Sequence, residues 1–210
     1  MTEPEPPEEP QIYLITPPEF SLSQFPDQLA KILDRAEIAC LRLALSATDE
    51  DTVMRAGDAV RDVAHARDVP LVIERHVQMV ERLGLDGVHL LDGARAVRDT
   101  RKLLGPDAIV GAFCGGSRHD GLNAGEAGAD YVAFGPVTAT ALGDGDIAGA
   151  DIFGWWSDVV EVPVVAEGAI TQDAIKELSA VTDFFAIGPE VWNAEDPAAA
   201  LSDLHSLMKL

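Results

Sequence analysis

The sequence predicts a (β/α)8 barrel, and three observations lead to this fold class. Eight short apolar runs alternate with eight segments of helical spacing along 210 residues. The first run is followed by I-T-P-P-E-F and has no G-x-G-x-x-G turn, which a doubly wound dinucleotide-binding sheet would carry there. That open sheet, the alternative architecture, would also need only five or six strands. Eight repeats therefore favour a closed barrel near its minimum length.

Eight β-strands are predicted from short runs rich in apolar and β-branched residues. In chain order they are Ile12–Thr16, Ala39–Leu45, Pro70–Ile73, Gly87–Leu90, Ala108–Phe113, Asp130–Phe134, Pro163–Ala166 and Asp183–Ile187. Runs that are apolar on both faces are typical of parallel strands covered by helices on the outside.

The segments between these runs are predicted to be amphipathic helices. In chain order they are Pro26–Ala36, Asp49–Arg67, Val77–Leu83, Ala94–Leu104, Leu122–Ala127, Ile152–Val160, Thr171–Ala180 and Pro197–Met208. Asp49, Thr171 and Asp196 are expected to be N-caps, because their side-chain oxygens can accept from the first free amides of a helix.

The first ten residues, M-T-E-P-E-P-P-E-E-P, are expected to form a disordered acidic tail. They lack the basic and apolar regions of a secretory signal. Residues 11–210 are then expected to form one barrel domain. The whole chain is 47% hydrophobic, which suffices for a large core. No apolar run of about 18 residues is present, so we expect no membrane span and a cytoplasmic protein.

The net charge of −21 also limits the partners. Such a field repels nucleic acid and anionic membranes, so neither is expected as a partner. It is also compatible with a simple adaptation to a salty cytoplasm. Cys40 and Cys114 lie far apart and predict neither a disulfide framework nor a metal site. Adjacent Trp155 and Trp156 would indicate a homodimer contact if one of them were exposed.

Two strand-to-helix junctions predict a phosphorylated small-molecule ligand. D-Y-V-A-F-G-P-V-T-A-T (residues 130–140) and P-V-V-A-E-G-A-I (163–170) each end an apolar run at small residues. Backbone without bulky side chains can approach a ligand closely, and free amides before a helix can bind an anion.

Several titratable residues follow the predicted strands and are candidates for chemistry at the barrel mouth. His89 ends the fourth strand and could be catalytic, or a hydrogen-bonded structural histidine. Glu74, Arg75 and His76 follow the third strand and could line a pocket, or form a surface ion pair. Asp92 could orient an imidazole or bind a metal weakly, or cap a helix.

The loop C-G-G-S-R-H-D (residues 114–120) and Glu167 supply the remaining candidates. His119 could act as a general acid or base. Cys114 could line the pocket, although a small buried thiol is the simpler interpretation. Ser117 or Asp120 would cap the next helix. Glu167, at the end of the seventh strand, could be a general base if paired with Arg42 or Lys176, or else a solvent-facing rim residue.

From Ile12 onward the chain resembles the thiamine phosphate synthase family, which includes thiazole tautomerases. The motifs that carry the resemblance are I-Y-L-I-T (12–16), L-D-G-V-H-L (85–90), G-A-D-Y-V-A-F-G-P-V-T-A-T (128–140) and P-V-V-A-E-G-A-I (163–170). The resemblance implies a (β/α)8 barrel. It also implies a reaction that joins a pyrimidine pyrophosphate to a thiazole phosphate, releases pyrophosphate and uses Mg²⁺.

The resemblance also implies site residues. Backbone amides after the last two strands would bind the phosphate, at Gly168, Ala169, Ile187 and Gly188. The lysine of the family's T-x-T-K segment is replaced by Gly143, whereas Thr140 is retained, and Thr138 and Thr140 are expected to line the ligand pocket.

The positions for pyrophosphate and Mg²⁺ differ from the family pattern. Arg42, Ala44 and Ser46 replace an inward-facing glutamine, arginine and lysine. Arg75 and Ala94 replace the two metal-binding carboxylates, and Cys114 replaces a serine. Losing two or three charge-assisted hydrogen bonds removes about 3–9 kcal/mol. We therefore expect weak or absent synthase activity and no metal site. The alternatives are a tautomerase-like isomerase that uses His119, and a non-catalytic phospho-ligand-binding or regulatory protein.

Overall fold

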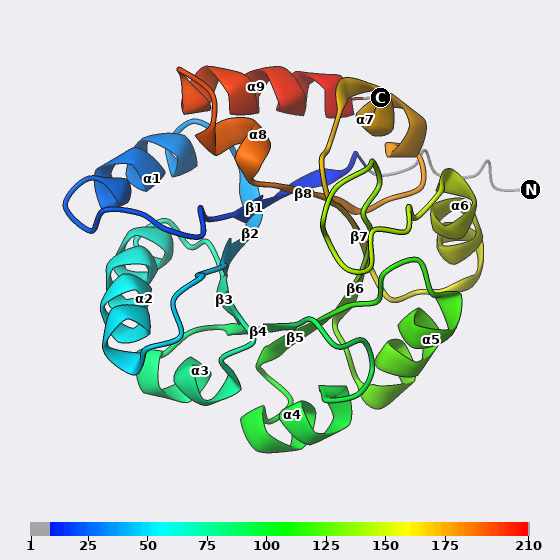
Figure 1. The fold of residues 1–210 in the computed structure, drawn as a ribbon, viewed down its shortest axis with the longest axis horizontal. Coiled ribbons are helices and arrows are strands. Elements are labelled where there is room, and N and C mark those ends of the chain that lie inside the picture. Colours follow the sequence, from blue (N-terminus) through cyan, green and yellow to red (C-terminus); the bar gives the residue numbers. More distant parts are fainter. Residues whose placement is uncertain (1–8, 210) are drawn as a thin grey trace, which may run out of the picture.

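The structure is a computed structural model that describes residues 9–209. Most of the predicted acidic tail, residues 1–8, lies outside the described residues. Eight parallel strands pair in sequence order, and β8 pairs with β1, so the sheet closes into a barrel surrounded by helices (Figure 1). The predicted (β/α)8 fold is therefore confirmed.

Each observed strand overlaps its predicted run, with ends that differ by at most two residues. The strands are β1 Gln11–Ile15, β2 Ile38–Leu43, β3 Leu71–Glu74, β4 Gly87–Leu90, β5 Ile109–Phe113, β6 Tyr131–Phe134, β7 Val164–Glu167 and β8 Phe184–Ile187. The helices are α1 Phe25–Leu33, α2 Glu50–His65, α3 Val77–Leu83, α4 Val97–Leu104, α5 Arg118–Ala127, α6 Ala150–Val159, α7 Gln172–Leu178, α8 Pro189–Trp192 and α9 Pro197–Met208.

The largest differences from the predicted helices are at α5 and α8. Helix α5 begins at Arg118, four residues before the predicted start at Leu122, because Ser117 accepts a hydrogen bond from the Asp120 amide and caps the helix. The polar first turn has no apolar spacing to reveal it. Helix α8 was not predicted, since a helix of four residues is too short to show a period. The N-caps expected at Asp49, Thr171 and Asp196 are confirmed.

Alternation along the strands divides the core into two layers. One apolar cluster lies between the sheet and the helices. The other fills the barrel interior, and its buried members are Tyr13, Cys40, Val72, Phe113, Tyr131, Ala133, Val165 and Ala186. Gly111 makes room for an aromatic ring there, because a Cβ at this position would lie 2.0 Å from Cζ of Tyr131.

Within residues 9–209, no helix combines the length and the hydrophobicity that a membrane crossing requires.

Candidate active site at the barrel mouth

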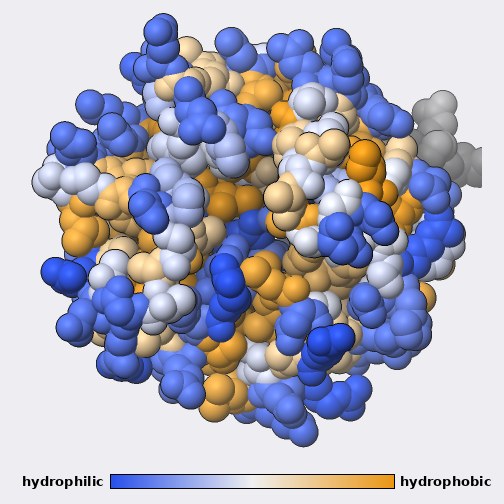
Figure 2. Space-filling view, in the orientation of Figure 1, coloured by the Kyte–Doolittle hydropathy of each residue, from blue (hydrophilic) through white to orange (hydrophobic). Residues whose placement is uncertain are grey.

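A cavity of about 580 Å³ opens at the carboxyl ends of β1, β2, β3, β7 and β8. Its walls are formed by Ile15, Thr16, Pro18, Arg42, Ala44, Leu45, Ser46, Glu74, Arg75, Thr140, Leu142, Glu167, Gly168, Ala169, Ala186, Pro189 and Glu190. On the face of the barrel seen in Figure 2, apolar residues gather near the centre and hydrophilic residues dominate the periphery. In (β/α)8 barrels this end of the strands carries the active site.

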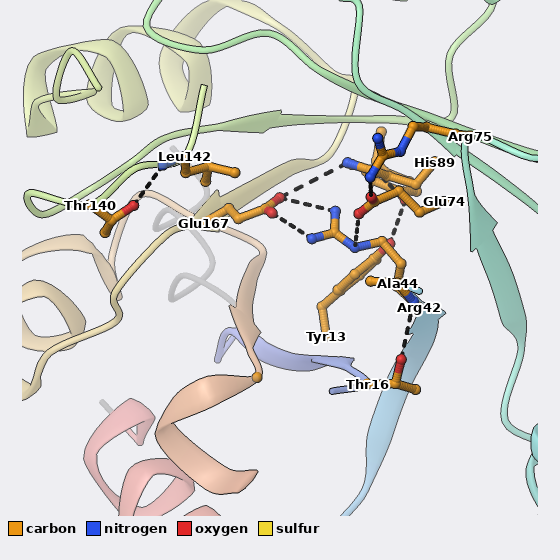
Figure 3. Close-up of polar contacts among 12 residues, drawn as sticks. Tyr13, Thr16, Arg42, Ala44, Glu74, Arg75, His89, Thr140, Leu142 and Glu167 are labelled. Carbon is orange, nitrogen blue, oxygen red and sulfur yellow. Dashed lines mark hydrogen bonds and ion pairs between the residues drawn. The ribbon is translucent and has the colours of Figure 1, made fainter. Parts of the chain in front are cut away.

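Arg42 and Glu167 face each other across the top of the barrel from β2 and β7 (Figure 3). Arg42 Nη1 donates to Glu167 Oε2 at 3.1 Å, and Nη2 donates to Oε1. The two side chains are only 3% and 5% exposed. Burial opposes the charge on Arg42, but the carboxylate of Glu167 outweighs it and raises the arginine's pKa. The predicted pairing with Arg42 is confirmed, and the solvent-facing alternative for Glu167 is wrong.

Glu74 and Arg75 extend this charged group at the end of β3. Arg75 Nη2 donates to Glu74 Oε1 at 2.8 Å, while Glu74 Oε2 lies 3.8 Å from Nε of Arg42. Glu74 is mostly buried whereas Arg75 is 61% exposed, so the expected ion pair reaches from the cavity to the surface. His76 follows at the start of α3, forms no side-chain cap and does not line the cavity.

His89 lies beneath the ion pair and is fully buried. Its Nδ1 is 2.9 Å from the hydroxyl of Tyr131, which is 2.7 Å from the hydroxyl of Tyr13. Within the described part of the chain its Nε2 has no hydrogen-bond partner, and it lies 4.0 Å from Glu167 Oε2. Burial, assisted by the charge of Arg42, lowers the pKa of His89 well below its ordinary value, so the ring is neutral. The geometry fits the structural alternative for this histidine.

The junctions after β7 and β8 hold a contact that the sequence analysis missed. The backbone turns sharply at Gly168 (φ 92°) and Ala169 (φ 48°). Glu190 Oε1 then accepts from the Ile170 amide at 2.9 Å, and Oε2 accepts from the Gly188 amide at 3.0 Å. The Gly188 amide, expected to be open for a phosphate, is therefore already paired. A glutamate two residues after Gly188 was the available signal, because acidic side chains early in a helix often reach back to a free amide.

The other residues expected around the phosphate make contacts with the chain's own backbone. Ile187 is fully buried and pairs with Leu14 in the sheet. Thr138 donates from Oγ1 to the carbonyl of Ala169 at 2.6 Å and so joins two loops of the mouth. Thr140 lines the cavity, and its Oγ1 accepts from the Leu142 amide at 2.9 Å.

Asp92 and Cys114 line a second cavity of about 1130 Å³, formed by the loops after β4, β5 and β6. Asp92 does not cap the following helix, which begins at Val97 after Ala96, so that alternative is wrong. Cys114 is buried, and burial raises the pKa of its thiol to about 12. The interpretation as an inert buried thiol fits this environment.

His119 stays apart from both cavities. It lies on the exposed side of the first turn of α5, where its Nε2 is 3.0 Å from Nδ2 of Asn123. It lines neither the mouth cavity nor the second one. The structure therefore does not bring His119 to His89 or Glu167, the other two catalytic candidates.

Across residues 9–209, no group of three or more His, Cys, Asp or Glu side chains is arranged to hold a metal. Mg²⁺ prefers several oxygen ligands, including carboxylates. By the resemblance, the two positions that hold metal-binding carboxylates in the family are Arg75 and Ala94 in this chain.

The closed parallel sheet defines a (β/α)8-barrel protein. Its charged cavity lies at the carboxyl ends of the strands, where proteins of this fold carry their active sites. The chain belongs to the thiamine monophosphate synthase family, whose model matches residues 12–187.

Curated relatives support this assignment. The thiamine-phosphate synthase of Rhodospirillum centenum is 40% identical over 202 residues, which cover 95% of this chain and 98% of the relative. That of Hyphomonas neptunium is 39% identical, covering 95% and 94%. Among solved structures, thiamine phosphate pyrophosphorylase from Pyrococcus furiosus has a TM-score of 0.82 at 23% identity, covering 95% and 96%. This last likeness shows the fold.

Proposed function

We propose that this member of the family is a cytoplasmic protein that binds a phosphorylated small heterocycle in the mouth cavity and catalyses the standard synthase reaction only weakly. The observation that carries the proposal is the closed ion pair of Arg42 and Glu167. Arg42 stands at a position that the resemblance assigns to pyrophosphate binding, and its guanidinium donates two hydrogen bonds to a carboxylate of the chain itself.

The charge balance of the cavity supports weak binding of pyrophosphate. Arg42 and Arg75 are opposed by Glu74, Glu167 and Glu190, which leaves one net negative charge on these walls. Pyrophosphate brings several further negative charges. Charge-assisted hydrogen bonds contribute about 1.5–3 kcal/mol each, so withholding both Arg42 donors costs about 3–6 kcal/mol. This corresponds to about two to four powers of ten in affinity.

A smaller ligand with one phosphate suits the cavity better. A volume of about 580 Å³ is typical of small-molecule sites. Ile15, Leu45 and Leu142 offer apolar surface for a ring. The Ile170 and Gly188 amides after β7 and β8, which Glu190 holds in this structure, would bind the phosphate once that carboxylate moves away.

A tautomerase-like isomerase is the second candidate. One observation favours it, with Glu167 and not His119 as the catalytic residue. Glu167 lies on the cavity wall, and Arg42 holds its carboxylate in one orientation, whereas His119 is outside the cavity. A fixed carboxylate next to a bound heterocycle can accept and return a proton. In this candidate Glu167 takes the role first expected of His119.

Turnover with both thiamine precursors and Mg²⁺ tests the proposal, with the Pyrococcus furiosus protein as the reference. We expect a rate at least about two powers of ten below the reference, together with measurable binding of thiazole phosphate by calorimetry. Comparable rates would contradict the weak-synthase proposal, and no binding of thiazole phosphate would contradict the ligand class. Proton exchange on bound thiazole phosphate that Glu167→Gln abolishes and His119→Ala retains would favour the isomerase.

A further inference from the structure

The carboxylate of Glu190 connects two separate junctions of the barrel mouth. The Ile170 amide follows β7 and the Gly188 amide follows β8, and both donate to this one side chain at 2.9 and 3.0 Å. Glu190 lines the mouth cavity together with Gly168 and Ala169. A carboxylate of the chain that lines the cavity therefore occupies two backbone donors, Ile170 and Gly188, which are themselves buried next to the cavity lining.

The donor after β7 is held in place independently of Glu190. The Thr138 hydroxyl donates to the Ala169 carbonyl at 2.6 Å, and the Val137 amide donates to the carbonyl of Glu167 at 3.0 Å. Gly168 is also enclosed, because a Cβ there would lie 2.8 Å from Cβ of Pro136. Glu190 itself is only half-buried, so its carboxylate can turn towards solvent while the loops keep their shape.

A second observation in the same cavity points to an anionic ligand. Arg42 is 98% buried. Among residues 9–209 its Nε has no hydrogen-bond partner, and the nearby Glu74 carboxylate is 3.8 Å away, beyond hydrogen-bond distance. The other two guanidinium nitrogens are bound to Glu167. A buried donor without a hydrogen-bond partner lowers the stability of the fold, so its presence calls for an explanation such as a bound ligand. Arg42 lines the cavity, and the Ile170 and Gly188 amides lie next to its lining under Glu190. These donors suit anions, and carboxylates of the chain occupy most of them.

We infer that Glu190 is a tethered competitor for the phosphate of the ligand. The carboxylate fills the amide pair when the cavity is empty, and a phosphate enters by displacing it. The inference rests on the proposed function, because it takes the ligand to carry a phosphate. The strength of the hydrogen bonds between Glu190 and the two amides then sets the affinity for phosphate. A ligand binds well only if its other contacts with the cavity outweigh the loss of these hydrogen bonds.

The test compares three variants by titration with inorganic phosphate and with phenyl phosphate. Glu190→Gln keeps the shape of the side chain but removes its charge, and Glu190→Asp keeps the charge on a shorter stem that cannot span both amides. Glu195→Gln is the matched control, because it removes one exposed charge near the same junction. Calorimetry gives the dissociation constants, and the ¹⁵N–¹H signals of Ile170 and Gly188 show where the anion binds.

We expect phosphate to bind Glu190→Gln about tenfold to a hundredfold more tightly than the wild type, with Glu190→Asp in between and Glu195→Gln unchanged. The amide signals of Ile170 and Gly188 should move on titration. Equal affinities for all four proteins, with these signals moving, would overturn the role of Glu190 while leaving the phosphate site intact. Binding that leaves both signals in place would overturn it as well. Failure of every protein to bind either probe or thiazole phosphate would remove the proposed function together with this inference.

Discussion

Arg42 and Glu167 are 125 residues apart in the sequence and meet inside the barrel, where little solvent reaches them. Each charge is acceptable there because the other is present. Removing one partner of such a pair leaves an uncompensated charge and typically costs about 3–5 kcal/mol. The pair therefore couples the electrostatics of the mouth to the stability of the barrel, and a substitution at either residue affects both.

His89 gives the stability a dependence on pH. Its pKa in the folded protein is lowered by burial and by Arg42, so below the ordinary value of about 6.5 the unfolded chain binds a proton more readily. Stability from this group is present above pH 6.5 and is lost as the pH falls below it, by at most about 1.4 kcal/mol per pH unit. The groups facing the ring are Tyr13, Tyr131, Arg42 and Glu167.

Urea unfolding of the wild type and of His89→Gln at pH 7.5 and 5.5 measures this contribution. We expect the wild type to lose more stability on acidification than the variant, because glutamine does not titrate. The exposed His119→Gln serves as the control and should follow the wild type. The same loss in all three proteins would show that His89 does not cause it.

At the scale of elements, β5 and β6 fit each other only because Gly111 has no side chain. A Cβ on residue 111 would lie 2.0 Å from Cζ of Tyr131, whose ring is enclosed in the barrel. We expect Gly111→Ala to lower the free energy of unfolding by about 3 kcal/mol, because the ring has no free space into which it can move.

Gly154→Ala in α6 is the matched control. No atom lies within 4 Å of a Cβ built there, so this change should stabilise the helix by about 0.5–1 kcal/mol. Thermal and urea unfolding of both variants would check the pair. Similar effects of the two substitutions would contradict the packing argument.

The elements also show what the sequence could and could not predict. Alternating apolar runs and helical segments were enough for the barrel, because each strand is buried on both faces and each helix on one. Glu167 was selected as a candidate by its position at a strand end, whereas Arg42 was selected by the resemblance and as one of two possible partners of Glu167, and the structure pairs the two. Glu190 was missed, since its helix has four residues and its second donor, Ile170, belongs to another junction. Contacts between junctions depend on strand register, which a single sequence does not specify.

At the scale of the whole molecule, charge is the dominant feature. The chain carries a net charge of −21 on 210 residues, so its acidic side chains repel one another. Salt shortens the range of this repulsion from about 30 Å at 0.01 M to about 10 Å at 0.1 M. We expect Tm to rise by roughly 3–6 °C between 0.01 and 0.3 M NaCl, because the folded state concentrates the charge more than the unfolded chain does. Differential scanning calorimetry checks this. A Tm that rises only above about 1 M would indicate ion exclusion from the surface instead.

The pairing of β8 with β1 also limits how far the barrel can fold while the chain is still being synthesised on the ribosome. The first strand to emerge needs the last one as a neighbour, so the nascent barrel keeps two unpaired edges until Phe184–Ile187 has been translated. A messenger truncated before that point would yield an open sheet prone to aggregation, because only the pairing of β8 with β1 closes the barrel.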